Sequence, residues 1–262
     1  MQSTDQAKIR GAVRETYGQV AQGGNSCCTG SSCCDPVVGT GASARLGYSD
    51  TELAAAPEGA DLGLGCGNPQ AIAALQPGET VLDLGSGAGF DCFLAARAVG
   101  ESGHVIGVDM TPEMLSRARD NAHKGDYRNV EFRLGEIEHL PVADDSIDAI
   151  ISNCVINLSP DKAQVFREAF RALKPGGRLA ISDIVATAEL PETARQDLAL
   201  YTGCMAGASL IDDLEAMLAA AGFADIRIQP KDESREFIRD WAPGLRVEDY
   251  VVSASIEAVK PA

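Results

Sequence analysis

The sequence contains no apolar run long enough to cross a bilayer, so a membrane-spanning helix is not expected. Residues 1–6 carry neither the basic nor the apolar segment of a secretory signal, which predicts a cytoplasmic protein. Positive charge is also scarce, since 22 Lys and Arg stand against 38 Asp and Glu, for a net charge of −16. Because nucleic acids and anionic membranes bind basic surfaces, neither is expected as a partner.

The chain also lacks any C-x-x-C pair, although it contains eight cysteines. A disulfide framework of the kind found in small secreted proteins is not expected in a chain of 262 residues without an export signal. In a reducing cytosol, such an excess of cysteine indicates metal binding or redox chemistry.

A glycine-rich turn lies at the centre of the sequence. Residues 80–84 form a short apolar run typical of a buried parallel strand, and residues 90–99 have a helical pattern. Between them, Gly85, Gly87 and Gly89 allow the backbone to turn sharply and to approach a ligand closely. A strand, a glycine turn and a helix in this order predict a cofactor at the carboxyl end of the strand, facing a helix N-terminus.

Three details narrow the choice of cofactor. The glycines are spaced G-x-G-x-G, which differs from the G-x-G-x-x-G of dinucleotide-binding proteins. Asp83 precedes them, where it would repel a pyrophosphate but attract an ammonium group. Asp109 ends the next strand, where a carboxylate can accept both ribose hydroxyls. A nucleoside with a cationic amino-acid tail satisfies all three, and this predicts S-adenosylmethionine.

These residues resemble the binding motifs of the class I methyltransferases. The resemblance implies that adenine lies near the end of the third strand, and that the methyl group points toward the end of the fourth. The expected cofactor contacts are Asp83, Gly85, Ser86, Gly87, Gly89, Asp109, Met110, Gly135, Glu136, Ile137 and Asn153.

Strands and helices alternate from residue 80 to residue 185, which predicts an α/β fold with a doubly wound, mostly parallel sheet. We expect three regions along the chain. Residues 1–60 form an N-terminal helix and a cysteine-rich loop, residues 61–190 form the Rossmann-like cofactor domain, and residues 191–262 form a small α+β layer covering the site. Within the last region, residues 191–201 and 209–221 are expected to be helical, and residues 223–229 and 250–259 to be strands.

Three cysteines lie where packing alone does not explain them. Cys66 stands between glycines, Cys154 follows the fourth strand, and Cys204 follows Gly203 beyond the expected domain. Each is near the expected cofactor edge, so the three together favour a soft ion that prefers thiolates. A structural zinc site usually has a fourth ligand and a C-x-x-C pair, whereas As(III) can be held by three sulfurs. The pattern leaves both interpretations open, beside that of buried structural cysteines.

Three segments resemble the signature segments of the arsenite methyltransferases: residues 64–69 (LGCGNP), residues 151–158 (ISNCVINL) and the pair Gly203-Cys204. The resemblance extends over residues 17–261. It implies that Cys66, Cys154 and Cys204 bind As(III), and that arsenite and methylated trivalent arsenicals are methylated for detoxification.

The resemblance also implies an auxiliary cysteine near the N-terminus that takes part in redox steps, with thioredoxin or glutathione resetting the enzyme. Two pairs compete for this position, Cys27-Cys28 and Cys33-Cys34, and we favour Cys33 and Cys34 because they are closer in sequence to Cys66. Cys92 lies within the first crossover helix and is expected to be structural.

Two other functions are compatible with the same motifs. One is methylation of a small organic metabolite, which would need an apolar pocket and usually a general base. The other is a thiol-rich protein that sequesters arsenic or a metal without transferring methyl groups.

Overall fold

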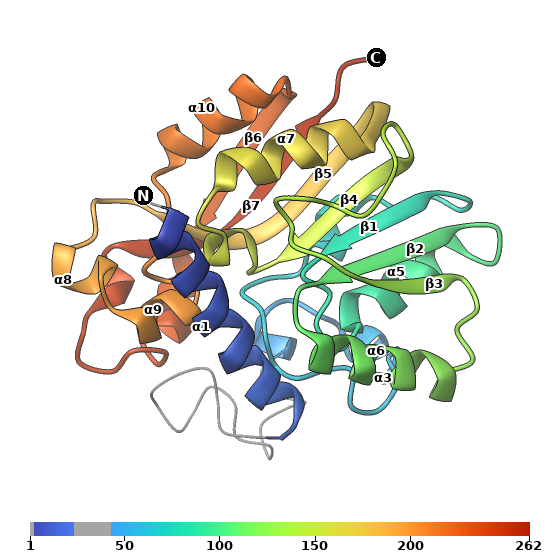
Figure 1. Ribbon diagram of the computed structural model, residues 1–262, viewed down its shortest axis with the longest axis horizontal. Helices are drawn as coiled ribbons and strands as arrows, with labels where there is room; N and C mark the ends of the chain where they lie inside the picture. Colours follow the sequence, from blue (N-terminus) through green and yellow to red (C-terminus); the bar gives the residue numbers. More distant parts are fainter. Residues whose placement is uncertain (1–2, 24–42) are drawn as a thin grey trace.

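The computed structural model describes residues 3–23 and 43–262, and in this part of the chain seven strands form one sheet (Figure 1). The strand order is β3-β2-β1-β4-β5-β7-β6, and the first five strands in this order run parallel. The strands are β1 (Thr80–Leu84), β2 (His104–Asp109), β3 (Val130–Leu134), β4 (Ile147–Asn153), β5 (Leu173–Ala186), β6 (Ala224–Lys231) and β7 (Val251–Val259).

Helices cover both faces of this sheet, as the alternation of strands and helices predicts. The helices of the described residues are α1 (Ser3–Ala21), α3 (Asp50–Ala55), α4 (Gln70–Ala73), α5 (Phe90–Val99), α6 (Pro112–Lys124), α7 (Lys162–Ala172), α8 (Glu192–Arg195), α9 (Leu198–Thr202), α10 (Ile211–Ala221) and α11 (Arg235–Ile238). Three short 3₁₀ turns join them: η1 (Ile156–Leu158), η2 (Asp232–Ser234) and η3 (Val247–Asp249). The doubly wound α/β fold is therefore confirmed.

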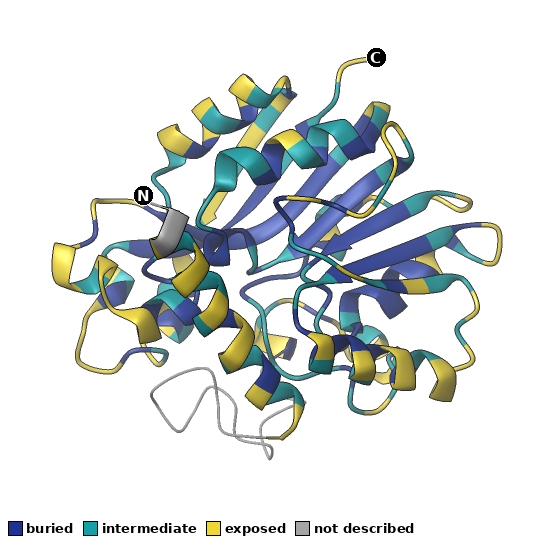
Figure 2. Cartoon of the chain, in the orientation of Figure 1, coloured by how far each residue is buried: buried dark blue, intermediate teal, exposed yellow. Residues whose placement is uncertain are grey.

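The core follows the period of two that a buried strand imposes. Val81 packs with Phe93 of α5 and Leu115 of α6 in one apolar cluster, whereas its neighbour Leu82 packs with Phe166 of α7 in another. The sheet between the helices is buried along most of its length (Figure 2). Within the described ranges, no helix is both long and apolar enough to cross a membrane.

The two C-terminal strands expected over residues 223–229 and 250–259 are present as β6 and β7. β7 pairs antiparallel with β5, and β6 pairs antiparallel with β7, so both extend the central sheet. β7, buried from Val251 to Ile256, pairs with the edge of β5 that would otherwise be open. Of the helices of this region, α10 packs on α7 and β6, whereas α9 packs on α1 and α11 on β7.

The single helix expected over residues 191–201 is divided into α8 and α9. Asp197 causes the division, because its carboxylate caps α9 by accepting hydrogen bonds from the N–H groups of Ala199 and Leu200. The short α9 brings Cys204, just beyond its end, into an apolar cluster with Val13 of α1 and with Cys66 and Cys154. Helix α1 lies between α6 and α9 and contacts both (Figure 1).

Candidate active site

The turn after β1 has the backbone shape that its glycines predict. Gly85, Gly87 and Gly89 have φ values of +70°, +51° and +93°, which side chains rarely adopt. A Cβ on Gly85 would lie 2.4 Å from a methyl carbon of Val155. The turn can therefore form only with glycine at this position. It leads into α5 beside the boundary between β1 and β4, where the strand order of the sheet reverses and ligands of such folds bind.

Three carboxylates surround this turn: Asp83 and Asp91, which are buried, and Asp109, which is partly buried. Burial raises the pKa of Asp83 well above its ordinary value, and the neighbouring charge of Asp91 raises it further. Burial also raises the pKa of Asp91 to about 6 and raises the pKa of Asp109. Such a concentration of acid favours a cationic ligand, because a cation would lower the cost of ionising these groups.

The residues present fit S-adenosylmethionine. The hydroxyl oxygen of Ser86 is buried and has no hydrogen-bond partner in the described part of the chain, so a ligand can satisfy it. Asp109 accepts hydrogen bonds from the N–H groups of Gly87 (2.9 Å) and Thr111 (2.8 Å), which fixes its carboxylate at the end of β2. Of the expected contacts, those that line the cavity beside the turn are Asp83, Gly85, Ser86, Gly87, Asp109, Met110, Gly135, Ile137 and Asn153.

Two expected contacts lie elsewhere. Gly89 forms the N-cap of α5, and a Cβ there would meet the rings of Phe93 and Phe132 at 2.8 Å, so this glycine serves close packing. The carboxylate of Glu136 forms ion pairs with Arg10 (3.5 Å) and Arg14 (3.3 Å) of α1. Glu136 thus ties α1 to the loop that follows β3, over the cofactor side of the cavity.

The structure brings together the three cysteines that the sequence singled out. Cys66, Cys154 and Cys204 are all buried in one apolar cluster, and the sulfurs of Cys66 and Cys154 lie within 4.8 Å of each other. The Cys204 thiol also donates to the carbonyl of Cys154 at 2.7 Å. Cys154 and Cys204 have φ values of +59° and +64°, which cost about 1 kcal/mol or more each and are typical of functional sites.

The three thiols are held in the protonated form. Burial raises the pKa of Cys66 to about 11 and that of Cys154 well above its ordinary value. The pKa of Cys204 is also raised well above its ordinary value, chiefly by its interaction with Cys154 and then by burial. Within the described residues all four cysteines, including Cys92, are free thiols.

Hydrogen bonds from distant segments fix the loop that carries Cys66. The side chain of Asn153, at the end of β4, accepts from the N–H of Cys66 at 3.0 Å and donates to the carbonyl of Gly67 at 2.9 Å. The hydroxyl of Ser253 in β7 donates to the carbonyl of Cys66 at 2.6 Å. The Asn153 side chain, expected to contact the cofactor, therefore positions a thiol as well as lining the cavity.

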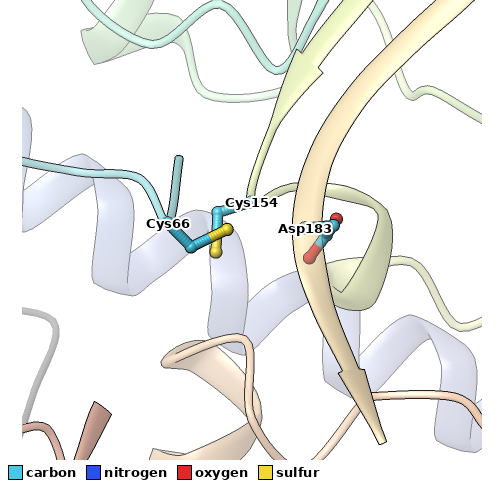
Figure 3. Close-up of side chains that lie close together, drawn as sticks. All are labelled: Cys66, Cys154 and Asp183. Atoms are coloured by element: carbon cyan, nitrogen blue, oxygen red, sulfur yellow. The ribbon is translucent and has the colours of Figure 1, made fainter. Parts of the chain in front are cut away.

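Four further residues belong to this site but were not assigned to it from the sequence. Tyr48 donates to Asp91 at 2.7 Å and accepts from Asn153 at 3.0 Å, so it joins the two halves of the site. The Cys92 thiol, expected to be structural, donates to Asp83 at 3.2 Å. Asp183 lies beside Cys66 and Cys154, with the ligand atoms of all three within 4.8 Å of one another (Figure 3). Only Asp183 had a sequence signal, since it is a carboxylate near the end of a strand.

Cys33 and Cys34, expected to take part in redox steps, lie outside the described residues, as do Cys27 and Cys28. Residues of α1 and of the C-terminal region line the cavity near the thiols, among them Tyr17, Phe237 and Trp241. The rings of Phe237 and Trp241 pack at a centroid distance of 5.4 Å. These aromatic side chains give the cavity an apolar wall that can exclude water.

Comparison with known proteins gives the same assignment for the fold. A family model described as a methyltransferase domain matches residues 75–222. A crystal structure of an arsenic(III) S-adenosylmethionine methyltransferase from Chlamydomonas reinhardtii is 37% identical, with a TM-score of 0.63, and the match covers 84% of this chain and 73% of that one.

Three curated relatives are named as arsenite methyltransferases. An arsenite methyltransferase from Halobacterium salinarum is 57% identical over 98% of this chain and 68% of its own length. One from Aquipseudomonas alcaligenes is 44% identical over 83% of this chain and 62% of its own length. The mouse arsenite methyltransferase is 42% identical over 58% of this chain and 43% of its own length. The chain thus spans about two thirds or less of the lengths of these relatives.

Proposed function

Since the chain belongs to the arsenite methyltransferase family, we propose that it transfers methyl groups from S-adenosylmethionine to As(III) bound by Cys66, Cys154 and Cys204. One observation carries this proposal. Three thiols from separate segments meet beside the cavity that the glycine turn and the buried carboxylates form. A site for a carbon, oxygen or nitrogen acceptor would have no use for such a set.

The protonated thiols suit the form in which arsenite reaches the site. Arsenite is As(OH)₃ at neutral pH, and three thiols can replace its three hydroxyl groups with release of three water molecules. No net proton has to leave the buried site in this exchange. The product holds arsenic between three sulfurs with a lone pair free, so no general base is needed to create the nucleophile.

The remaining catalytic work of the chain is positioning. S-adenosylmethionine supplies a methyl group on a sulfonium sulfur. In this proposal Asp83 binds its ammonium group, Asp109 binds its ribose, and Cys154 holds arsenic at the end of β4, next to β1; all three residues line the cavity. Fixing the reacting atoms at roughly 3–3.5 Å in line can provide much of the rate enhancement. The apolar wall around Trp241 excludes water from the site while the methyl group moves from the sulfonium sulfur to arsenic.

We propose that the oxidation of arsenic in each transfer is reversed by cysteine pairs. Methylated arsenic is formally pentavalent, and two thiols can reduce it while forming one disulfide. Cys33 and Cys34 are our candidates, with thioredoxin or glutathione reducing the disulfide; this step follows from family resemblance. The four free thiols of the described chain support a reducing compartment, the cytoplasm.

The decisive assay incubates the full chain with arsenite, S-adenosylmethionine and a dithiol, and detects methylated arsenicals by mass spectrometry. Wild type is expected to produce them, and Cys66→Ser is expected to produce almost none while binding S-adenosylmethionine normally. If wild type forms no methylated arsenical, or if Cys66→Ser matches it, the proposal is wrong. Methylation of organic metabolites by a thiol-deficient variant would instead favour the organic acceptor.

A further inference from the structure

Asp183 is a buried carboxylate beside the thiols for which arsenite has no use. One carboxylate oxygen and the sulfurs of Cys66 and Cys154 lie within 4.8 Å of one another, and all three residues are buried (Figure 3). As(III) takes three sulfurs, and its lone pair occupies the fourth position. The chain therefore carries a fourth potential ligand that its proposed substrate leaves free.

Hydrogen bonds fix the Asp183 carboxylate in place. Its Oδ2 accepts from the N–H of Ile156 at 2.8 Å, and its Oδ1 accepts from the N–H of Ile184 at 2.7 Å and from the side chain of Asn157 at 2.9 Å. Carboxylates that ligate metals are held in the same way, because outer hydrogen bonds set their orientation. Oδ1 already accepts two hydrogen bonds, whereas Oδ2 accepts one and keeps a lone pair for a further partner.

The charges around Asp183 also suit a divalent cation. Three thiolates, one carboxylate and a divalent cation carry a net charge of −2. The partly buried Lys162 interacts electrostatically with Asp183 and donates to the carbonyl of Gly207 at 2.6 Å, so one positive charge is fixed nearby.

We propose that Cys66, Cys154, Cys204 and Asp183 also form a tetrahedral site for a thiophilic divalent cation of the zinc or cadmium type, with Asp183 as the fourth ligand. The sulfurs of a tetrahedral zinc site are roughly 3.8 Å apart, given Zn–S bonds of about 2.3 Å. The sulfurs of Cys66 and Cys154 and one oxygen of Asp183 lie within 4.8 Å of one another, so these three need only a small contraction around zinc and a smaller one around the larger Cd²⁺. Cys204 lies next to them, with its thiol 2.7 Å from the carbonyl of Cys154, and its side chain turns toward the cation to complete the site. Three thiols release three protons to solvent as the cation binds.

The bound cation excludes arsenite, because the two compete for the same three sulfurs. This site shares its cysteines with the proposed function, but cation binding does not depend on methyl transfer. A failure of the methylation assay leaves cation binding measurable, and the reverse also holds. Asp183 distinguishes the two ligands, since it contributes to cation binding alone.

The test uses the full chain with Cys27, Cys28, Cys33 and Cys34 changed to serine, so that these thiols do not bind the probe. Cd²⁺ is titrated, and its ultraviolet sulfur-to-cadmium charge-transfer absorption is recorded. One Cd²⁺ with three thiolates is expected. Asp183→Asn should weaken Cd²⁺ binding at least about 10-fold and As(III) binding less than about threefold. Equal Cd²⁺ affinity in this variant and its parent would overturn the proposal.

A second variant keeps the test decisive if Asp183→Asn does not fold. Cys204→Ser should lower the charge-transfer intensity per bound Cd²⁺ by about one third, as one of three thiolates is lost. An unchanged intensity would overturn the four-ligand site. The exposed Asp144, which pairs with Arg171 at 2.7 Å far from the thiols, provides the matched control. Asp144→Asn should leave both affinities as they are.

Discussion

The cofactor side and the thiol side of the site are built in different ways. On the cofactor side, Asp83, Gly85, Gly87 and Asp109 come from two adjacent strand–turn–helix units, and the side chain of Asp109 bonds directly to the turn of the preceding unit. On the thiol side, Asn153 reaches across 87 residues of sequence and Ser253 across 187 to fix one cysteine, Cys66. A local unit can form a cofactor site, whereas a site with three thiols requires the completed fold.

The two sides also differ in charge. The cofactor side concentrates carboxylates whose pKa values are raised by burial, so it favours a cation. The thiol side holds protonated sulfurs, also with pKa values raised, which favour a neutral species that exchanges hydroxyl groups for thiols. The two sides meet at Asn153 and where Gly85 approaches Val155. Because they use different residues and favour ligands of different charge, substitutions on the two sides can be tested separately.

The largest effect should come from the thiol side alone. Cys154→Ser removes one of the three sulfurs and is expected to lower the rate of arsenite methylation at least about 100-fold, since losing a ligand costs more than losing a partner of a ligand. Affinity for S-adenosylmethionine, measured by calorimetry, should change less than about twofold. A fall in the affinity for S-adenosylmethionine together with the methylation rate would show that the two sides are not separable.

The reciprocal change acts on the cofactor side. Asp83→Asn keeps the shape of the side chain but removes the charge that attracts an ammonium group. Affinity for S-adenosylmethionine should fall about 10- to 100-fold, the usual cost of a lost charge-assisted hydrogen bond. Binding of As(III), followed by quenching of Trp241 fluorescence, should stay within about threefold of wild type. Unchanged cofactor affinity would remove Asp83 from its proposed role.

The contact between the two sides can be tested with a pair of glycines. Gly85→Ala places a Cβ against Val155, next to Cys154, and at a positive φ; it should reduce the free energy of unfolding by about 2–4 kcal/mol. Gly87→Ala, with φ also positive but nothing within 4 Å of the new Cβ, should cost only about 1 kcal/mol. Urea denaturation measures both, and equal losses would contradict the close approach at Gly85.

The smallest effect concerns the carboxylates of the cofactor side in the absence of ligand. Burial raises the pKa of Asp91 from 3.8 to about 6, so its contribution to stability is fully present below pH 3.8 and is lost as the pH rises through 6. Between pH 4 and pH 7, wild type should lose about 1–3 kcal/mol of unfolding free energy relative to Asp91→Asn. The exposed Asp120, changed to asparagine, is the control, and parallel pH profiles for wild type and Asp91→Asn would refute this account.

The sequence predicts most of the cofactor side because local rules govern it. An apolar strand, glycines at positions that require positive φ, and carboxylates at strand ends identify β1, β2 and their ligand without knowledge of distant contacts. The three cysteines could be named for the same reason, since each lies at a strand end or in a glycine-bordered loop.

Other features depend on contacts that no local pattern encodes. Tyr48, Asp91 and Asn153 meet through side chains 43 to 105 residues apart. The antiparallel addition of β7 to β5 is a matter of strand order, which periodicity does not determine. The division between α8 and α9 depends on a single capping residue, Asp197, within an otherwise helical pattern.

The central claim, that three distant sulfurs converge on one arsenic atom, is tested most directly by X-ray absorption at the arsenic edge. The sample is the full chain with Cys27, Cys28, Cys33 and Cys34 changed to serine, loaded with one equivalent of As(III). Three sulfur neighbours are expected, and one fewer in each of Cys66→Ser, Cys154→Ser and Cys204→Ser. Two or fewer sulfurs in the loaded parent, or a coordination number that none of these substitutions changes, would contradict the account.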